Sequence, residues 1–195
     1  SFMKLSGSYQ INLEKQKVWE ALNDPEILKQ AIPGCEEFIK SSDTEFTAKA
    51  TNKIGPFNAS FVGNIELGDL NPPDSYKISG SGNSPVGFAS GEASVRLEDH
   101  DNGTKLTYEV QANVGGKIAQ VGSRLIDMTA KKMADIFFGK FSDLISNDET
   151  KSKKKTEVKE GNVKEQVADN KKPNQKIFIY SAVIIAAVIL IFLVF

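Results

Sequence analysis

Six segments with the alternating pattern of β-strands follow one another, separated only by short turns. They are expected at residues 36–40, 45–54, 57–69, 75–82, 86–98 and 104–114. The breaks between them are rich in Gly, Pro, Asn and Ser, as at residues 71–74 and 102–103. Because connections this short join neighbouring strands, the pattern predicts an antiparallel meander.

Helical patterns stand on both sides of this strand region. A half-buried strand over residues 4–12 comes first, and Val18, Trp19 and Leu22 then share one face of a short helix. Pro25 is suited to open a second short helix, which ends at Pro33. A long apolar helix over residues 116–146 closes the domain. The order predicts an α+β fold, in which helices cover one face of a curved, seven-stranded sheet.

The face of the sheet that we assign as inner carries many small residues between large ones. A sheet wrapped around a helix is packed to crystal-like density unless something else fills the gap. Small residues therefore either let the helix come close or leave a void. Gly122 favours close approach, whereas the thick apolar coat of the helix favours a pocket, and we prefer an apolar ligand cavity to a solid core. The small inner residues are Ala48, Ala50, Ala59, Gly63, Gly80, Gly82, Ala89, Gly91, Ala93 and Ala112.

The candidate ligand-binding residues are the large apolar side chains that face this void. Tyr76 or Tyr108 could donate a hydrogen bond to a ligand carbonyl, although a buried tyrosine is as commonly satisfied by protein. The predicted cavity wall consists of Phe61, Ile65, Tyr76, Ile78, Tyr108, Val110, Ile118, Val121, Leu125, Met128 and Phe137.

The composition argues against several classes of function. The formal net charge of −1 disfavours nucleic acid as the main partner. Cys35 and His100 are the only residues of their types, which disfavours a zinc cluster and a catalytic Cys-His pair. No nucleophile-elbow or phosphate-loop motif is present. We expect no catalytic residues, no metal and no cofactor chemistry, and hence a protein that is not an enzyme.

The last nineteen residues, 177–195, contain no charge and predict a transmembrane helix. As a helix they span roughly 28 Å, close to the thickness of a bilayer core. Lysines precede them, and residues 147–176 carry nine lysines and six acids without an aromatic, which is typical of a disordered linker. We expect the natural chain to start at Met3, after Ser1 and Phe2. We therefore expect a cytoplasmic domain over residues 3–146, a linker and a single-pass anchor in the cell membrane.

Four stretches resemble the family of the G subunit of carbon-monoxide dehydrogenase, and the likeness extends over residues 3–141. That family belongs to the START-like (SRPBCC) polyketide-cyclase and lipid-transport superfamily, whose members have the helix-grip fold. The stretches read "MKLSGSYQINLEKQKVWEALNDPEILKQAIPGCEEF", "DLNPPDSYKISGSG", "GFASGEASVRLED" and "GTKLTYEVQANVGGKIAQVGSRLIDMTAKKMADIFF".

The resemblance implies an apolar cavity between a seven-stranded sheet and the long C-terminal helix. It also implies an accessory role: recruiting a molybdenum hydroxylase, such as carbon-monoxide dehydrogenase, to the membrane and binding a quinone. We expect the partners to be the membrane, a quinone or other lipid, and such an enzyme complex. Two alternatives stay open, namely a ligand-free scaffold that binds protein through its surface and a START-like cyclase or hydrolase.

Overall fold

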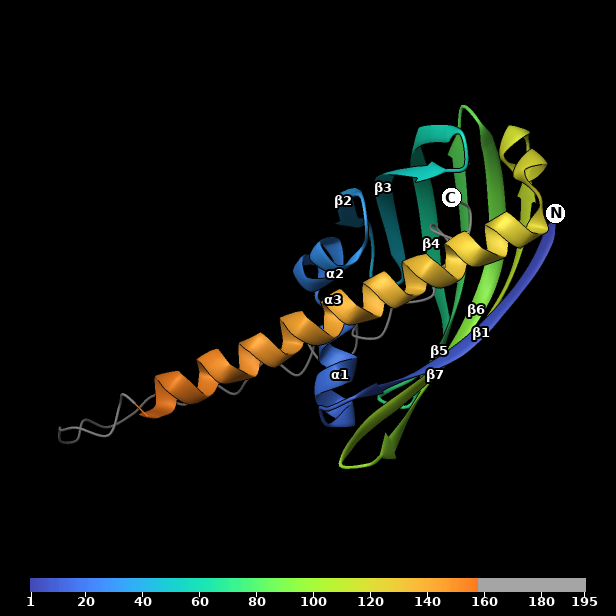
Figure 1. Cartoon of the computed structure of the whole chain (residues 1–195). Coiled ribbons are helices and arrows are strands. Elements are labelled where there is room, and N and C mark those ends of the chain that lie inside the picture. The colour runs from blue at the N-terminus through green and yellow to red at the C-terminus, as the bar shows by residue number, and fades with distance from the viewer. Residues whose placement is uncertain (158–195) are drawn as a thin grey trace.

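The computed structural model describes residues 1–157, which form one sheet and the helices packed against it (Figure 1). The strands closely follow the predicted segments. They are β1 (Phe2–Ile11), β2 (Cys35–Lys40), β3 (Glu45–Ile54), β4 (Phe57–Asn71), β5 (Ser75–Ser84), β6 (Gly87–His100) and β7 (Gly103–Gly115). The helices are α1 (Lys15–Ala21), α2 (Pro25–Ala31), a 3-10 helix η1 (Lys117–Val121) and α3 (Ser123–Glu157).

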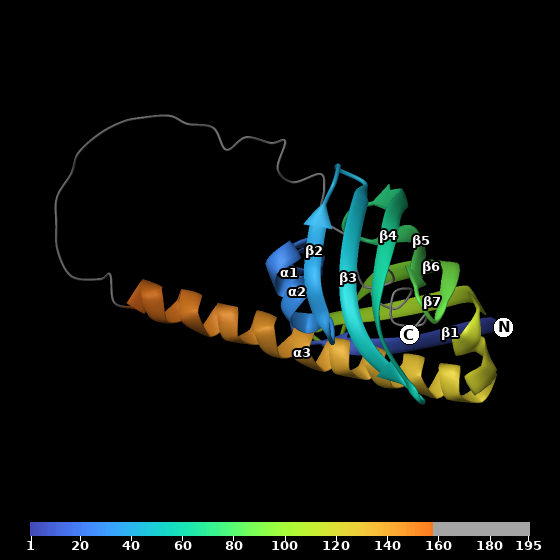
Figure 2. The same ribbon diagram turned by 90° about the horizontal axis from the view of Figure 1, so that it is seen from above.

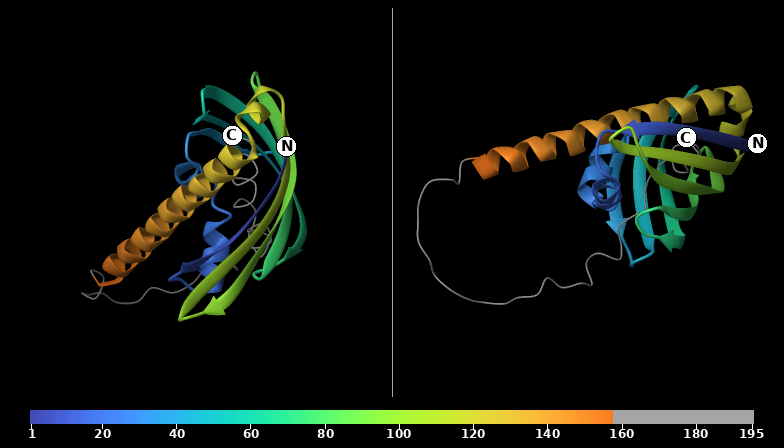
Figure 3. Two further views of the ribbon diagram at one scale, coloured as in Figure 1. Left: turned by 45° about the vertical axis from the view of Figure 1, so that its right-hand side comes forward. Right: turned by 90° about the horizontal axis from the view of Figure 1, so that it is seen from below.

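All seven strands pair antiparallel in the order β1-β7-β6-β5-β4-β3-β2. Strands β2 to β7 form the predicted meander, and β1 adds itself to the free edge of β7. The α+β fold predicted from the order of the elements is therefore confirmed, with α1, α2 and α3 on the concave side of the sheet (Figures 1 and 3).

The two short helices form where local sequence signals allow them. Asp24 caps α2, because its carboxylate accepts a hydrogen bond of 3.0 Å from the backbone N–H of Glu26. Pro25 occupies the first turn, where its missing N–H leaves no bond unmade. Val18 of α1 and Leu28 of α2 are fully buried; α1 approaches β6 and β7, whereas α2 approaches β2 and α3.

The closing helix differs from the single helix predicted over residues 116–146. The chain first forms the short helix η1 and then turns at Gly122, where φ is +93°. A Cβ at Gly122 would meet no atom within 4 Å, so the glycine is explained by its backbone angle and the close-approach interpretation was wrong. Gly116, with φ of +80°, makes the corresponding turn before η1.

The predicted boundary of the linker at residue 147 is also corrected, because α3 continues to Glu157. The lysines and glutamates of residues 147–157 are good helix formers, and a charged composition does not prevent a helix that has already begun from continuing. The remainder of the predicted linker and the predicted transmembrane segment, residues 177–195, lie outside the described residues. Within residues 1–157, no helix combines the length and the apolarity that crossing a bilayer requires.

Candidate functional site

The inner face of the sheet carries the residues that the alternating pattern assigned to it. Phe46, Ile65 and Val95 are buried, whereas their neighbours in sequence on the other face are mostly polar and exposed. The predicted inner face is therefore confirmed, and no one-residue slip exchanges the two faces.

A band of small residues crosses this inner face from β3 to β7. The strand register places these residues opposite one another in two adjacent rows. In β5, β6 and β7 both rows lie in the half of the strand that is nearer to the β5–β6 turn and to η1. The first row is Ala48, Gly63, Gly82 and Ala89, and the second includes Gly80, Gly91 and Ala112.

Helix α3 does not lie flat on the centre of the sheet. Among the described residues, its backbone comes closest to β1 and α2, and no central strand from β3 to β6 has a comparable approach. Figure 2 shows α3 running along the β1 side of the sheet and past its edge. The backbone of the helix thus stands away from the strands that carry the small residues.

The start of the closing segment lies across the same end of the sheet. The backbone N–H of Ile118 in η1 donates a 2.9 Å hydrogen bond to the carbonyl oxygen of Val86 in the β5–β6 turn. Side-chain atoms of Val121 and Leu125 lie 3.3 Å from where a Cβ of Gly55 in the β3–β4 turn would stand. Both turns are therefore held against η1 and the first turn of α3.

A second group of contacts fastens the middle of α3 to β1. The ring of Tyr9 stacks on that of Phe138, with ring centroids 3.9 Å apart, and its hydroxyl donates a hydrogen bond to the carboxylate of Asp135. Tyr108 extends over Gly7 of the adjacent strand, which has no side chain to occupy that space. We call the group formed by Gly7, Tyr9, Tyr108, Asp135 and Phe138 the seam.

The environment of the seam favours the protonated form of its two tyrosine side chains, Tyr9 and Tyr108. Burial, and then the hydrogen bond to Asp135, raise the pKa of Tyr9 far above its usual range. Burial likewise raises the pKa of Tyr108. Both groups stay neutral at physiological pH and serve as hydrogen-bonding groups rather than as bases.

Trp19 of α1 packs against the inner face of the sheet at Tyr76 of β5. Its side chain is 1% exposed, and its ring meets that of Tyr76 edge to face, with centroids 5.7 Å apart. Its indole N–H has no hydrogen-bond partner among the described residues. A buried donor of this kind is costly unless something accepts from it.

All the predicted wall residues except Met128 fall into three groups in the structure. Ile118, Val121 and Leu125 close the end of the sheet at the two turns, whereas Phe137 packs in an aromatic group with Phe138 and Phe141 further along α3. The remaining residues lie buried on the inner face of the sheet, namely Phe61, Ile65, Tyr76, Ile78, Tyr108 and Val110. Their role in binding a ligand stays a prediction.

Met128 is a correction to the predicted wall. Its side chain is 61% exposed and lies on the outer side of α3. The sequence pattern placed it inside because the long helix was taken to start at residue 116. The break at Gly122 separates η1 from α3, so the helical phase cannot be carried across it.

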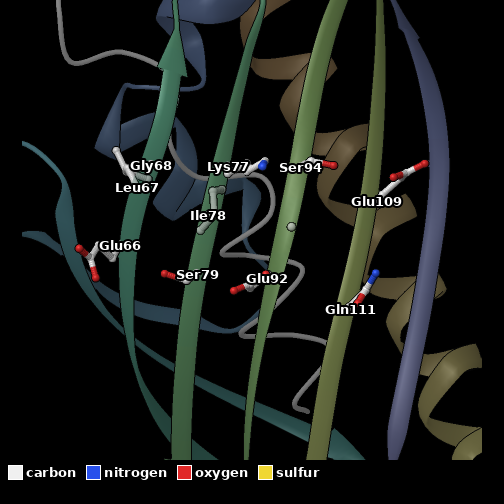
Figure 4. A pocket seen from close by; sticks show the side chains of 11 residues that line it. Glu66, Leu67, Gly68, Lys77, Ile78, Ser79, Glu92, Ser94, Glu109 and Gln111 are labelled. Carbon is white, nitrogen blue, oxygen red and sulfur yellow. The ribbon is translucent and has the colours of Figure 1, made fainter.

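The outer face of the sheet has a depression that is lined mainly by polar residues (Figure 4). A depression of about 520 Å³ there is lined by three glutamates, Glu66, Glu92 and Glu109, together with serines and one lysine. That lysine, Lys77, forms an ion pair of 3.2 Å with Asp69. Nowhere in residues 1–157 do three His, Cys, Asp or Glu side chains gather closely enough to hold a metal ion.

The seam was missed at the sequence level. The alternating pattern marks Gly7 and Tyr9 as inner residues, but the partner of β1 is β7, about a hundred residues away in the chain. The spacing of Asp135 and Phe138, three residues apart in a helix, was the one local signal of a mixed polar and aromatic contact.

Comparisons with known proteins agree with this geometry. The family model of the carbon monoxide dehydrogenase G subunit (CoxG) matches residues 7–146. A conserved protein from Geobacillus kaustophilus, known from a crystal structure, is 31% identical, with a TM-score of 0.71 over 74% of this chain and 96% of its own. No curated protein sequence matches significantly.

More distant structures show the fold alone. A protein from Rhizobium leguminosarum is 14% identical, with a TM-score of 0.58 over 75% of this chain and 96% of its own. The Zhui aromatase/cyclase from Streptomyces sp. R1128 is 13% identical, with a TM-score of 0.55 over 75% and 94%. The curved sheet closed by a C-terminal helix is thus a START-like fold, and the chain belongs to the CoxG family, that of the carbon monoxide dehydrogenase G subunit.

Proposed function

We propose that this protein is a non-enzymatic accessory protein that holds a quinone or a similar lipid between the inner face of its sheet and the η1–α3 segment. In this role it serves or recruits a membrane-associated molybdenum hydroxylase such as carbon monoxide dehydrogenase. The family match supports the accessory role.

The observation that carries the proposal is the small-residue band beneath a helix that stands aside. The band has little side-chain volume, and the backbone of α3 does not closely approach the central strands that carry it. Interiors are close-packed, so such room is filled by chain or by ligand. The surrounding walls, built of Phe61, Ile65 and Ile78, are apolar and suit an isoprenoid or acyl chain.

A polar group for the ligand is available in the other half of the inner layer, next to Tyr76. The indole N–H of Trp19 is buried without a partner among residues 1–157, and a quinone carbonyl is an acceptor of the right kind. The hydroxyl of Tyr108, in contrast, lies over Gly7 at the seam. Trp19 is therefore a better candidate than Tyr108 for a hydrogen bond to the ligand.

Fluorescence of Trp19 tests the proposal directly, because it is the only tryptophan in the chain. Quinones quench indole emission on close contact, so a short-chain ubiquinone should quench the purified protein in a saturable manner. Mass spectrometry of an organic extract should identify any lipid that co-purifies. Absence of both saturable quenching and a bound lipid would favour the ligand-free scaffold.

A pair of variants on neighbouring residues distinguishes a ligand site from a solid core. Ala89 lies in the band, and Ser90 follows it on the outer face. If the band faces a ligand, Ala89→Leu should abolish quenching with little change in stability, and Ser90→Leu should leave quenching intact. If the core is solid, Ala89→Leu should instead cost about 1–3 kcal/mol of stability through overpacking.

Tethering to the membrane is a separate part of the proposal. Residues 177–195 are uncharged and long enough to cross a bilayer core. Deleting them should move the protein from the membrane to the soluble fraction of a cell lysate, with its fold unchanged. A truncated protein that still sediments with membranes at high salt would contradict the anchor.

A further inference from the structure

One end of the molecule combines exposed apolar side chains with unpaired cations. There the β3–β4 turn, the β5–β6 turn and η1 meet, at the end of the sheet opposite to the β6–β7 turn (Figure 1). We call the exposed residues of this end the tip surface. It consists of Lys53, Pro56, Val62, Pro85, Phe88, Lys117 and Arg124.

The apolar part of the tip surface is held in an exposed position by the strand register. Val62 and Phe88 lie on the outer face, each directly opposite Asn83, and they are 53% and 54% exposed. The ring of Phe88 rests on Gly115, so it is fixed in place without being covered. Pro56 and Pro85 extend the apolar surface onto the exposed turns.

The charges nearest to these residues are cations, and the first acid along the closing segment, Asp127, follows Arg124 by three residues. Lys53, Lys117 and Arg124 are exposed, and none forms an ion pair with any described residue. The segments that build this end, residues 52–65, 79–91 and 110–126, contain no aspartate or glutamate. The acids gather instead at the opposite end, where Asp69, Asp74, Glu98, Asp99 and Asp101 lie in or beside two turns.

This separation of cations and acids between the two ends matters because the domain as a whole is acidic. Residues 1–146 carry a formal net charge of −4, so an anionic membrane repels the domain on average. Attraction is possible only in the orientation that presents the cationic end. Apolar side chains within a ring of cations are the pattern of a surface that inserts into the interface of an anionic bilayer.

We infer that the tip surface docks this protein on an anionic lipid bilayer, with η1 and the two turns facing the lipid. The inference rests on the proposed function in one respect, namely that the bilayer is the source of the ligand. The small-residue band lies in the half of the sheet next to the tip surface, and η1 sits between them, flanked by Gly116 and Gly122. A ligand leaving the bilayer at this end has the shortest path into the inner layer.

Vesicle flotation of the fragment 1–157 tests the docking surface without the predicted anchor. The fragment is a reasonable unit, because the Geobacillus kaustophilus homologue consists almost entirely of the matching domain. The vesicles are phosphatidylcholine alone, or phosphatidylcholine mixed with an equal part of phosphatidylglycerol. We expect binding only to the mixed vesicles, and weaker binding as salt is raised.

A variant that removes three positive charges, and a matched control, locate the surface. The tip variant changes Lys53, Lys117 and Arg124 to Gln. The control changes to Gln three lysines that are exposed elsewhere, namely Lys17, Lys77 and Lys140. Each cation near an anionic surface contributes about fivefold to partitioning, so the tip variant should lose about a hundredfold. The control should bind within about twofold of the unmodified fragment. Equal losses in both variants, or no preference for phosphatidylglycerol, would overturn the inference.

The apolar part is tested by Phe88→Ser together with Val62→Ser. This variant should lose insertion, measured as binding that persists at high salt, whereas Met128→Ser, equally exposed on α3, should not. Melting temperature and the emission maximum of Trp19 verify that each variant is folded. Unchanged binding of a folded Phe88→Ser, Val62→Ser variant at high salt would contradict insertion by this end.

Quenching of Trp19 by a short-chain ubiquinone in solution keeps this inference separate from the proposed function. A tip variant that no longer floats but is still quenched supports docking by the tip surface and ligand binding together. A fragment that floats through its tip surface but is never quenched supports docking and refutes the quinone site.

Discussion

The two halves of the inner layer are built on different principles. In the half around the seam and Trp19, aromatic side chains of β1, β7 and α3 contact one another, as in the 3.9 Å stack of Tyr9 on Phe138, and Trp19 of α1 contacts Tyr76 of β5. In the half next to the tip surface, the strands carry glycine and alanine, and the covering segment is a short 3-10 helix between two glycines. The first half supplies most of the packing that holds α3, and the second half carries less side-chain volume.

This contrast separates the part of the fold that supplies most of the aromatic packing from the part in which we propose that a ligand binds. A domain whose whole core resembled the seam would be more stable but would have no room for a guest. A domain built only like the half next to the tip surface would bury too little apolar surface to be stable. Substitutions in the closely packed half should therefore lower the free energy of unfolding more than substitutions in the half next to the tip surface.

The largest loss of stability is expected from removing an aromatic ring of the seam. Phe138→Ala removes a fully buried ring that contacts Tyr9, Tyr108 and Phe137, and should lower the free energy of unfolding by about 3–5 kcal/mol. Phe88→Ala, at an exposed ring of the tip surface, should cost less than about 1 kcal/mol. Urea unfolding followed by Trp19 fluorescence measures both. Similar losses would erase the contrast between the halves.

The next effect concerns the turn at Gly122. Its backbone lies at φ +93° and ψ 151°, a region that L-residues avoid, so Gly122→Ala should cost about 1–3 kcal/mol. Gly139→Ala is the matched control, because a Cβ meets nothing within 4 Å at either position. Within helix α3 the control should stabilise by about 1 kcal/mol. If Gly122→Ala also stabilised, the hinge would have a different conformation from the one described.

A comparable or smaller effect is expected where Tyr108 crosses Gly7. A Cβ at Gly7 would stand 2.6 Å from the Tyr108 hydroxyl oxygen, so Gly7→Ala should cost about 1–3 kcal/mol through overpacking. Combining it with Tyr108→Leu should give a loss smaller than the sum of the two single losses, since the clash is then relieved. Strict additivity in a double-mutant cycle would show that the two residues do not touch.

The smallest effect appears only at alkaline pH. Because the pKa of Tyr9 is raised in the folded state, its contribution to stability is complete below about pH 10 and is lost as the pH rises further. Tyr9→Phe should therefore reduce the alkaline fall in the urea midpoint, while Tyr108 keeps part of it. The measurement is a series of urea curves from neutral pH to about pH 11. Identical alkaline slopes in both proteins would contradict the raised pKa.

Much of the architecture followed from local patterns. Alternation located every strand to within a few residues, because one face of each strand is buried against helices and the other faces solvent. The same alternation separated the inner from the outer face correctly. Pro25 and Pro33 bounded the second helix through rules that act within one turn.

The candidate site was predicted less completely, for physical reasons that particular residues illustrate. Gly122 was interpreted as a close approach, because a sequence does not reveal a positive φ. Met128 was placed inside because the helical phase was counted through that glycine. The seam depends on the pairing of Gly7 with Tyr108, and a pair of residues so far apart in the chain leaves no periodic signal.

By itself, the sequence determined the order and kind of the elements, the inner face of the sheet and the small-residue band within it. These properties depend on the period of hydrophobicity, which each segment carries alone. Only the tertiary structure decided that α3 packs near β1 rather than over the central strands. It also decided that the unpaired cations and the exposed apolar side chains lie at the same end of the molecule. Such features arise from the register between distant segments and from backbone angles at two glycines, which no local pattern encodes.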